Sequence, residues 1–251
     1  MFVKLSRQAT VLSDCRRISW VARAHQHERT RPVPIPLVTQ SVGDALAESL
    51  RERVLTEDIK AGVPVTEASV ANDYQVARQT AKAAIERLVG EGLLERTAHR
   101  SARVPVLDTS QVKDLYFARG VIESRCYELL AAERRVAPAA ETAHAAFATA
   151  AAGMDVAPIV DADIEFHRAL VLSLGSARLA RSHALIINEM RLCLAQVQSR
   201  HLLDATEIAS EHETILRAIR SGDAARAGSA GLDHLAHAEE KLLEHMSAPR
   251  T

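Results

Sequence analysis

Aromatic residues are scarce in this chain, at 3% of its 251 residues. Aromatic and β-branched residues favour strands, whereas the alanine, leucine, glutamate and arginine that dominate here favour helices. We therefore expect a mainly helical protein. The hydrophobic share of 47% is typical of a globular chain and argues against disorder as its dominant state.

Cysteine is also rare, and the three residues present, Cys15, Cys126 and Cys193, are odd in number and lack a CxxC spacing. This pattern excludes a disulfide framework and a zinc ribbon, and it fits a reducing cytoplasm. No run approaches the roughly 18 apolar residues that cross a bilayer, and the N-terminus lacks the apolar core of a signal peptide. We expect a cytoplasmic protein that does not contact a membrane.

An overall charge excess is missing as well, because the formal net charge is −1. The charge is nevertheless uneven, since basic residues outnumber acidic ones in residues 1–38. Pro32, Pro34 and Pro36 disfavour a helix there. The sequence predicts a flexible basic arm over residues 1–38, ahead of the folded regions.

The first folded region is predicted over residues 39–107. Val42, Leu46, Leu50 and Val54 recur every fourth residue, which predicts a helix over 41–59. Two further helices are indicated by TEASVANDY and VARQTAKAAIERLVGEG, and the short apolar pieces LLERT and ARVPV suggest a small hairpin. Three helices followed by a hairpin predict a winged helix-turn-helix.

The string GVPVTEASVANDYQVARQTAKAAIERLVGEGLLERTAHRSARV carries a more specific pattern. It resembles the DNA-binding domain of the GntR regulators without a gap, matching at Gly62, Glu67, Val76, Arg78 and the run Glu91, Gly92, Leu93. The resemblance implies double-stranded DNA as a partner.

Six side chains are candidates for contacting that DNA. Arg78 begins the third helix, where a guanidinium can reach a guanine edge, and Lys82 lies one turn on, where it can meet a phosphate. A solvated helix face is the alternative for such a basic pair in isolation. The full candidate set is Arg78, Gln79, Thr80 and Lys82 on the helix, with Arg100 and Arg103 on the wing.

The second folded region is predicted over residues 108–246, with a tail at 247–251. Breaks at Pro138, Pro158, Gly175 and Gly222 divide it into an all-helical bundle of about six helices. The S-x-x-E of Ser210 and Glu213 suggests a capping box. The helices are expected at 109–133, 138–152, 157–174, 177–200, 207–221 and 223–246.

Asp163 and His167, in DADIEFH, are four residues apart and share one face of a helix. This region resembles the FCD ligand-binding domain of the FadR subfamily of GntR regulators, through Arg119 and Glu123, the D-x-x-F-H string and the EHxxILxAIxxGD element. The resemblance implies a divalent metal held by Asp163, His167, His212 and His234. One carboxylate and three imidazoles suit zinc, nickel, manganese or iron.

A small carboxylate effector could complete the coordination shell, and Arg119 is expected to pair with a second anionic group of it. His237 is the rival for the fourth ligand, whereas His183, His201 and His245 are interpreted as surface or packing residues. Phe166 is expected in the core.

These observations predict a DNA-binding transcriptional regulator, in this family most often a repressor, that binds a pseudo-palindromic operator as a homodimer. Its operator affinity would follow a small organic acid bound at the metal. A metal-dependent hydrolase remains an alternative, because such a site can activate water. A third interpretation is a metal-free regulator that binds an acyl ligand. Asp163, His167, His212 and His234 would then form a hydrogen-bonded polar core.

Overall fold

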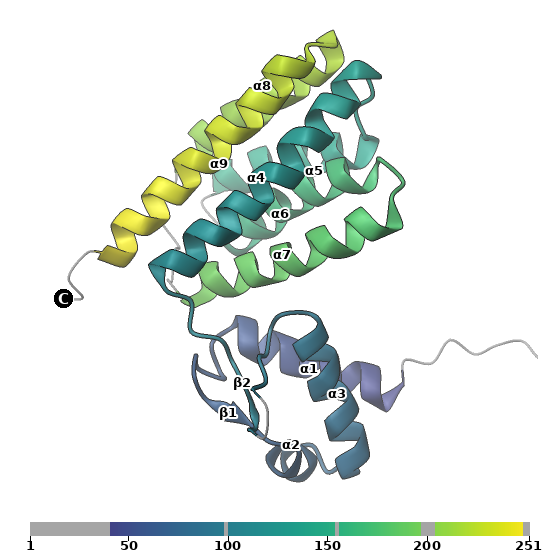
Figure 1. The fold of residues 1–251 in the computed structure, drawn as a ribbon, viewed down its shortest axis with the longest axis vertical. Helices are drawn as coiled ribbons and strands as arrows, with labels where there is room; N and C mark the ends of the chain where they lie inside the picture. The colour runs from purple at the N-terminus through teal and green to yellow at the C-terminus, as the bar shows by residue number, and fades with distance from the viewer. Residues whose placement is uncertain (1–40, 98–99, 154–155, 197–203, 248–251) are drawn as a thin grey trace, which may run out of the picture. The chain divides into compact units, whose positions relative to one another are not determined.

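A computed structural model describes residues 41–97, 100–153, 156–196 and 204–247 of the chain. Within these ranges it has nine helices and one small antiparallel sheet (Figure 1). The mainly helical fold class is therefore confirmed. The arm predicted at residues 1–38 lies outside the described residues, as does the tail after Ser247.

The three helices of the predicted winged helix-turn-helix are α1 (Val42–Leu55), α2 (Glu67–Asp73) and α3 (Arg78–Gly90). Leu50 and Ile85 are fully buried where α1 packs against α3. The apolar repeat of α1 is confirmed except at Val42, which is 66% exposed. The first helix ends earlier than expected, and Glu57, two residues on, takes a left-handed backbone conformation with φ of 58°.

The predicted hairpin pairs differently from the expectation. β2 (Ala102–Arg103) forms its ladder with β1 (Pro64–Val65), whereas the LLERT segment contributes a single bridge between Glu95 and Arg103. The backbone of Arg103 exchanges two hydrogen bonds with Glu95, at 2.9 and 3.0 Å. The wing strand thus lies between two partners, and one of them comes from the segment before α2.

Six helices form the all-helical region, as the sequence predicts: α4 (Thr109–Ala132), α5 (Pro138–Gly153), α6 (Val156–Leu172), α7 (Ala177–Gln196), α8 (Ala205–Ser221) and α9 (Ala224–Ser247). Figure 1 shows α4 and α9 side by side along much of their length. Among the described residues, no helix is both long and apolar enough to cross a bilayer.

Helix boundaries follow local capping chemistry. Asp108 caps α4 by accepting from the backbone amides of Ser110 and Gln111. Gly222, with φ of 83°, ends α8, as the sequence predicts. The capping box expected at Ser210 is wrong, because α8 begins at Ala205 and is capped by Asp204, six residues earlier.

The packing of α4 against α9 depends on small residues. A Cβ at Gly231 would lie 2.7 Å from two ring carbons of Tyr127, and one at Gly228 would lie 2.7 Å from Glu128 Oε1. Real Cβ atoms do not approach other atoms so closely. The two glycines therefore let α9 approach α4, and this brings Tyr127 beside the polar cluster described next.

Candidate metal centre and nucleic-acid interface

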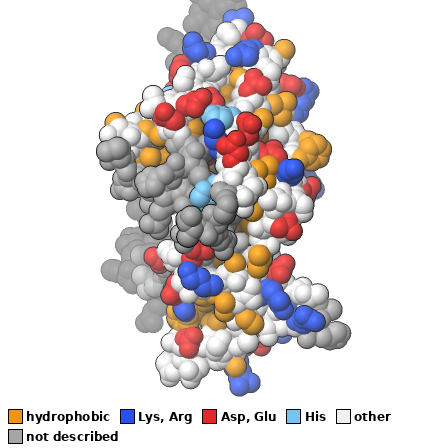
Figure 2. Space-filling view, turned by 90° about the vertical axis from the view of Figure 1, so that its left-hand side faces the viewer, with side chains coloured by type: hydrophobic (Ala, Val, Ile, Leu, Met, Phe, Trp, Pro, Cys, Tyr) orange, Lys and Arg blue, Asp and Glu red, His pale blue; other side chains and the backbone are white. Residues whose placement is uncertain are grey.

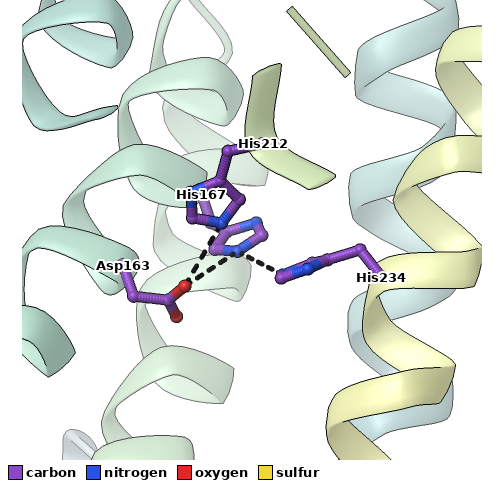
Figure 3. A group of neighbouring side chains, drawn as sticks. All are labelled: Asp163, His167, His212 and His234. Carbon is purple, nitrogen blue, oxygen red and sulfur yellow. Dashed lines mark hydrogen bonds and ion pairs between the residues drawn. The ribbon is translucent and has the colours of Figure 1, made fainter. Parts of the chain in front are cut away.

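Four polar side chains from three helices converge in the helical region. α6 supplies Asp163 and His167, α8 supplies His212 and α9 supplies His234, with their rings and carboxylate turned toward one another (Figure 3). One ligand atom from each lies within 4.8 Å of all the others. The structure thus brings together the four residues that the resemblance implied, in a group that could hold a metal ion.

The shortest distances in this group involve Nε2 atoms. His167 Nε2 lies 3.1 Å from His234 Nε2 and 3.8 Å from Asp163 Oδ1. His212 Nε2 lies 3.2 Å from the same Asp163 oxygen. All three imidazoles therefore present Nε2 to the centre, which leaves Nδ1 of each ring for other contacts.

The imidazoles are packed firmly. Phe166 stacks on His212, with ring centroids 3.9 Å apart and an interplanar angle of 18°. His167 and His234 are stacked in turn, at 5.0 Å and 22°. His167 and His212 are fully buried, and so is Phe166, which lies in the core as expected. Ring packing of this kind limits rotation of the candidate ligands.

Behind His167 lies a buried polar network on α4. His167 Nδ1 is 2.9 Å from Glu123 Oε2 and 2.8 Å from the Tyr127 hydroxyl, and that hydroxyl donates to Glu123 at 3.1 Å. His183 Nε2 lies 2.9 Å from Glu123 Oε1. Because Glu123 is fully buried and accepts from several donors, it joins α4 to α6 and α7.

Arg119 belongs to the same network. Its Nε donates to Glu123 Oε1 at 2.9 Å and its Nη2 to Glu123 Oε2 at 3.4 Å, and the side chain is only 4% exposed. The guanidinium also lies over the Tyr116 ring, 5.7 Å from the centroid. Arg119 thus holds a carboxylate of the protein itself, while its predicted contact with an effector stays a prediction.

Burial and neighbouring charged groups shift the pKa of the two buried carboxyl groups, Asp163 and Glu123, in opposite directions. Burial raises the pKa of Asp163, but His167 and His212 outweigh burial and hold that pKa well below its ordinary value. In the same way burial raises the pKa of Glu123, and Arg119 and His167 together hold it well below its usual range. Both carboxyl groups are therefore anionic at neutral pH.

The three histidines of the cluster differ in the direction in which their pKa is shifted. Burial lowers the pKa of His212 to about 3 and also lowers the pKa of His234, so both rings are neutral at pH 7. For His167 burial acts in the same direction, but Glu123 and Asp163 together outweigh it and raise the pKa. Two neutral imidazoles and one carboxylate thus offer lone pairs to the centre of the cluster.

His212 supplies the clearest sign that the residues fit a cation. Both of its ring nitrogens are buried and make no hydrogen bond within the described residues, although Nε2 lies 3.2 Å from Asp163. Buried polar atoms without a partner are uncommon and costly. Three imidazoles and a carboxylate at these separations fit a borderline divalent cation such as zinc, nickel, manganese or iron.

His237, the rival ligand, does not join the four. Its Nδ1 lies 2.9 Å from Glu211 Oε1 and its Nε2 3.7 Å from Glu207. His183 is 1% exposed and bonds to Glu123, so it is a buried polar residue and not a surface one. Local sequence spacing does not distinguish such a histidine from an apolar packing residue.

The predicted DNA-binding side chains of α3 are accessible. Arg78, Gln79 and Lys82 are exposed on its first turns, and Thr80 is half-buried. Ala77, which precedes the helix, has no side-chain acceptor to cap it. The Thr80 amide donates to the Ala77 carbonyl at 2.9 Å, so the amides of Arg78 and Gln79 are the ones left for an outside acceptor such as a phosphate.

On the wing, Arg100 is exposed and Arg103 is half-buried within β2. Arg100 lines a hollow of about 350 Å³ together with Arg96 and residues at the start of α2. Sequence reasoning missed Arg96, whose Nη1 donates to Glu86 at 2.7 Å. Figure 2 shows acidic, basic and apolar side chains intermingled on the face it draws, in keeping with the net charge of −1.

Two family models match the chain. Residues 43–104 match the model of bacterial regulatory proteins of the gntR family, and residues 114–237 match the FCD domain. The chain belongs to the GntR family and carries an FCD domain. It is a transcriptional regulator of a DNA-binding family, and the resemblance to GntR regulators with an FCD domain is confirmed.

Solved structures agree at the level of the fold. A GntR transcriptional regulator from Rhodococcus sp. RHA1 is 22% identical with a TM-score of 0.70, covering 83% of this chain and 99% of its own. McbR/YncC of E. coli is 15% identical with a TM-score of 0.66, at 82% and 99% coverage. No protein with a curated description matches the sequence.

Proposed function

We propose that this GntR-family regulator is a cytoplasmic repressor whose affinity for its operator is controlled by a small organic acid at a divalent metal site. Asp163, His167, His212 and His234 would hold the metal. The observation that carries the proposal is the convergence of these four ligand atoms from α6, α8 and α9, with both nitrogens of His212 buried and without a hydrogen bond among the described residues, and with Nε2 3.2 Å from Asp163.

A bound divalent cation would supply positive charge and open positions at which a carboxylate can bind. The protein contributes a single negative charge to that shell, from Asp163, together with neutral imidazoles from His212 and His234. The occupied site would retain net positive charge. Arg119, whose charge acts on both Asp163 and His234, adds to the preference for an anion.

The effector would act through α4. This helix follows the winged-helix region directly in sequence, beginning at Thr109, and it carries the Arg119–Glu123 pair that contacts His167. A ligand changes DNA affinity only if it binds one arrangement of the protein better than another. We infer that effector binding shifts α4 through Arg119 and Glu123.

On the DNA side, Arg78 would read a base edge, with Gln79, Thr80 and Lys82 beside it on α3 and Arg100 and Arg103 on the wing. One recognition helix covers few base pairs, so we propose that a homodimer binds a pseudo-palindromic operator. The exposure of Arg78 and Lys82 on the first turns of α3 supports this assignment.

A gel shift on the DNA upstream of the gene tests the interface. Arg78→Ala is expected to weaken specific binding by about 1–3 kcal/mol. Equal binding of specific DNA by wild type and variant would show that the recognition helix is misassigned.

Metal analysis of dialysed protein, followed by a thermal-shift screen of organic acids with and without chelator, tests the effector site. About one equivalent of metal, and stabilisation by an acid that chelator abolishes, are expected. A metal content near zero would favour the metal-free acyl-binding regulator. Turnover of esters or amides that is lost in His167→Ala would favour the hydrolase.

A further inference from the structure

A half-buried carboxylate on α8, Glu211, lies directly behind one of the proposed metal ligands. Its Oε2 is 2.8 Å from His234 Nδ1, and its Oε1 is 2.9 Å from His237 Nδ1. Each oxygen of Glu211 therefore has its own histidine on α9. The side chain is 25% exposed, so unlike Glu123 it stands near the surface of the helical region.

The direction of these bonds fixes the state of His234. A carboxylate only accepts, so Nδ1 of His234 must carry the proton and donate it. In a neutral imidazole the other nitrogen is then a lone pair. Nε2 of His234 is the atom that lies 3.1 Å from His167 Nε2, at the centre of the four-residue cluster.

We propose that Glu211 is the positioning residue of the metal centre on its α8–α9 side: it fixes His234 as the Nδ1–H tautomer with Nε2 directed at the metal. This inference rests on the proposed metal site. His237 has a supporting part, because it holds the second oxygen of Glu211. His237 was the alternative fourth ligand in the sequence analysis. In the structure it instead holds Glu211, the carboxylate that contacts the ligand His234.

The three histidines of the metal centre differ in whether a carboxylate contacts their Nδ1 atom. His167 has Glu123 behind its Nδ1 and His234 has Glu211, whereas the Nδ1 of His212 is buried and has no partner in the part of the chain that the structure describes. Carboxylates behind metal-bound imidazoles orient the ring and raise its basicity, and their loss weakens metal binding roughly 10- to 100-fold. Glu211 is the better one to test, because Glu123 also holds a buried arginine and its replacement disturbs folding.

The experiment measures zinc affinity of the full chain by competition with a chromophoric chelator at fixed pH. Glu211→Ala is expected to weaken zinc binding roughly 10- to 100-fold, and Glu211→Gln, which keeps an acceptor oxygen, to recover part of the loss. Glu207→Ala is the matched control. That carboxylate lies one turn earlier on α8 and reaches His237 Nε2 at 3.7 Å, so its removal should change affinity little.

A second readout separates positioning from a general structural effect. Long-range nitrogen–proton NMR spectra of the zinc-loaded protein should show His234 as the Nδ1–H tautomer in the wild type. In Glu211→Ala this signal should shift or broaden while that of His167 is retained. Circular dichroism of the metal-free variants should match the wild type, which shows that the fold is intact, whereas the melting temperature of Glu211→Ala should fall because His234 Nδ1 loses its acceptor.

Three results would overturn the inference. If Glu211→Ala binds zinc as tightly as wild type and Glu207→Ala, Glu211 does not position His234 while the metal centre itself stands. If wild type holds no zinc, the inference and the metal centre fall together. A second equivalent of zinc that is lost in Glu207→Ala would make Glu207, Glu211 and His237 a separate metal site.

Discussion

At the residue scale, His212 shows how a binding site can oppose stability. Its ring is fully buried against Phe166; within the described residues Nδ1 has no hydrogen-bond partner, and Nε2 only approaches Asp163, at 3.2 Å. A buried polar group without a partner costs about 1–3 kcal/mol in a folded protein. The residue thus lowers the stability of the metal-free chain, and a bound cation would offset that cost.

Replacing His212 with leucine should therefore separate the two effects. We expect His212→Leu to abolish the stabilisation of the protein by metal. The free energy of unfolding of the chelator-treated protein should change by less than about 1 kcal/mol, because the removal of an unpaired buried nitrogen is set against the loss of a partner of Asp163. His234→Leu is the contrast, because it removes a partner of Glu211 and should destabilise the metal-free protein. Urea unfolding of both variants, with and without zinc, measures the difference. Full zinc affinity in His212→Leu would show that His212 is not a ligand.

Glu123 has the opposite role, because it accepts hydrogen bonds from the buried polar groups around it. Its removal in Glu123→Ala leaves the buried guanidinium of Arg119 without its carboxylate, and we expect a loss of about 3–5 kcal/mol. Glu128→Ala, on the same helix, breaks a pair with the exposed Arg125 and removes a half-buried side chain beside Gly228, and it should cost about 1 kcal/mol or less. Thermal or urea unfolding compares the two. Similar losses in both variants would contradict a buried ion pair at Arg119.

The four candidate ligands could be predicted from sequence, but the carboxylates behind them could not. Asp163 and His167 share a helix face by spacing alone, and the family pattern supplied His212 and His234. The family pattern includes Glu123 and Glu211 but predicted no contact with a ligand for either, and helical spacing does not distinguish the buried Glu123 or the half-buried Glu211 from the many solvated glutamates of this chain. Their roles depend on which helix packs beside them, which is a tertiary property.

At the scale of elements, helices were predicted better than strands. Apolar periodicity and breaks at Gly222 and Pro138 gave the order and approximate ends of α4 to α9. The wing strand was expected to pair with the preceding segment, yet its ladder is formed with β1 at Pro64–Val65. Strand pairing between distant segments carries no periodic pattern, so sequence reasoning favoured the adjacent partner.

The contact between α4 and α9 offers a test at the same scale. Gly231→Ala places a Cβ against the buried ring of Tyr127, and we expect a loss of about 1–3 kcal/mol from overpacking. Because the Tyr127 hydroxyl lies 2.8 Å from His167 Nδ1, metal affinity should fall too. Gly90→Ala is the control: nothing lies within 4 Å of its Cβ position, so stability should stay level or rise by about 0.5–1 kcal/mol. Equal stability of both variants would contradict the close approach at Gly231.

At the scale of the whole molecule, DNA binding has to succeed without a basic surface. The net charge is −1, and the winged-helix region carries nearly equal numbers of basic and acidic side chains. Long-range attraction to DNA is therefore expected to be weak, and on the proposed interface binding would depend on a few placed cations such as Arg78, Lys82 and Arg100. A protein of this kind should neutralise few phosphates, so its affinity should depend on salt less steeply than that of a basic DNA-binding protein.

Salt titrations of operator binding can assign these cations to bases or to phosphates. For Lys82→Ala we expect weaker binding to all DNA sequences and a slope of log K against log salt that is shallower by about 1 for each recognition helix, because a phosphate contact releases a counterion. Arg78→Ala should instead reduce discrimination between operator and unrelated DNA, since a guanidinium on a base edge contributes specificity. Glu86→Ala, an exposed change on the same helix that removes a partner of Arg96, serves as the control for altered charge alone. If Arg78→Ala changed only the salt slope and left discrimination intact, Arg78 would be a phosphate contact and the base-reading residue would have to be sought at Gln79 or Thr80.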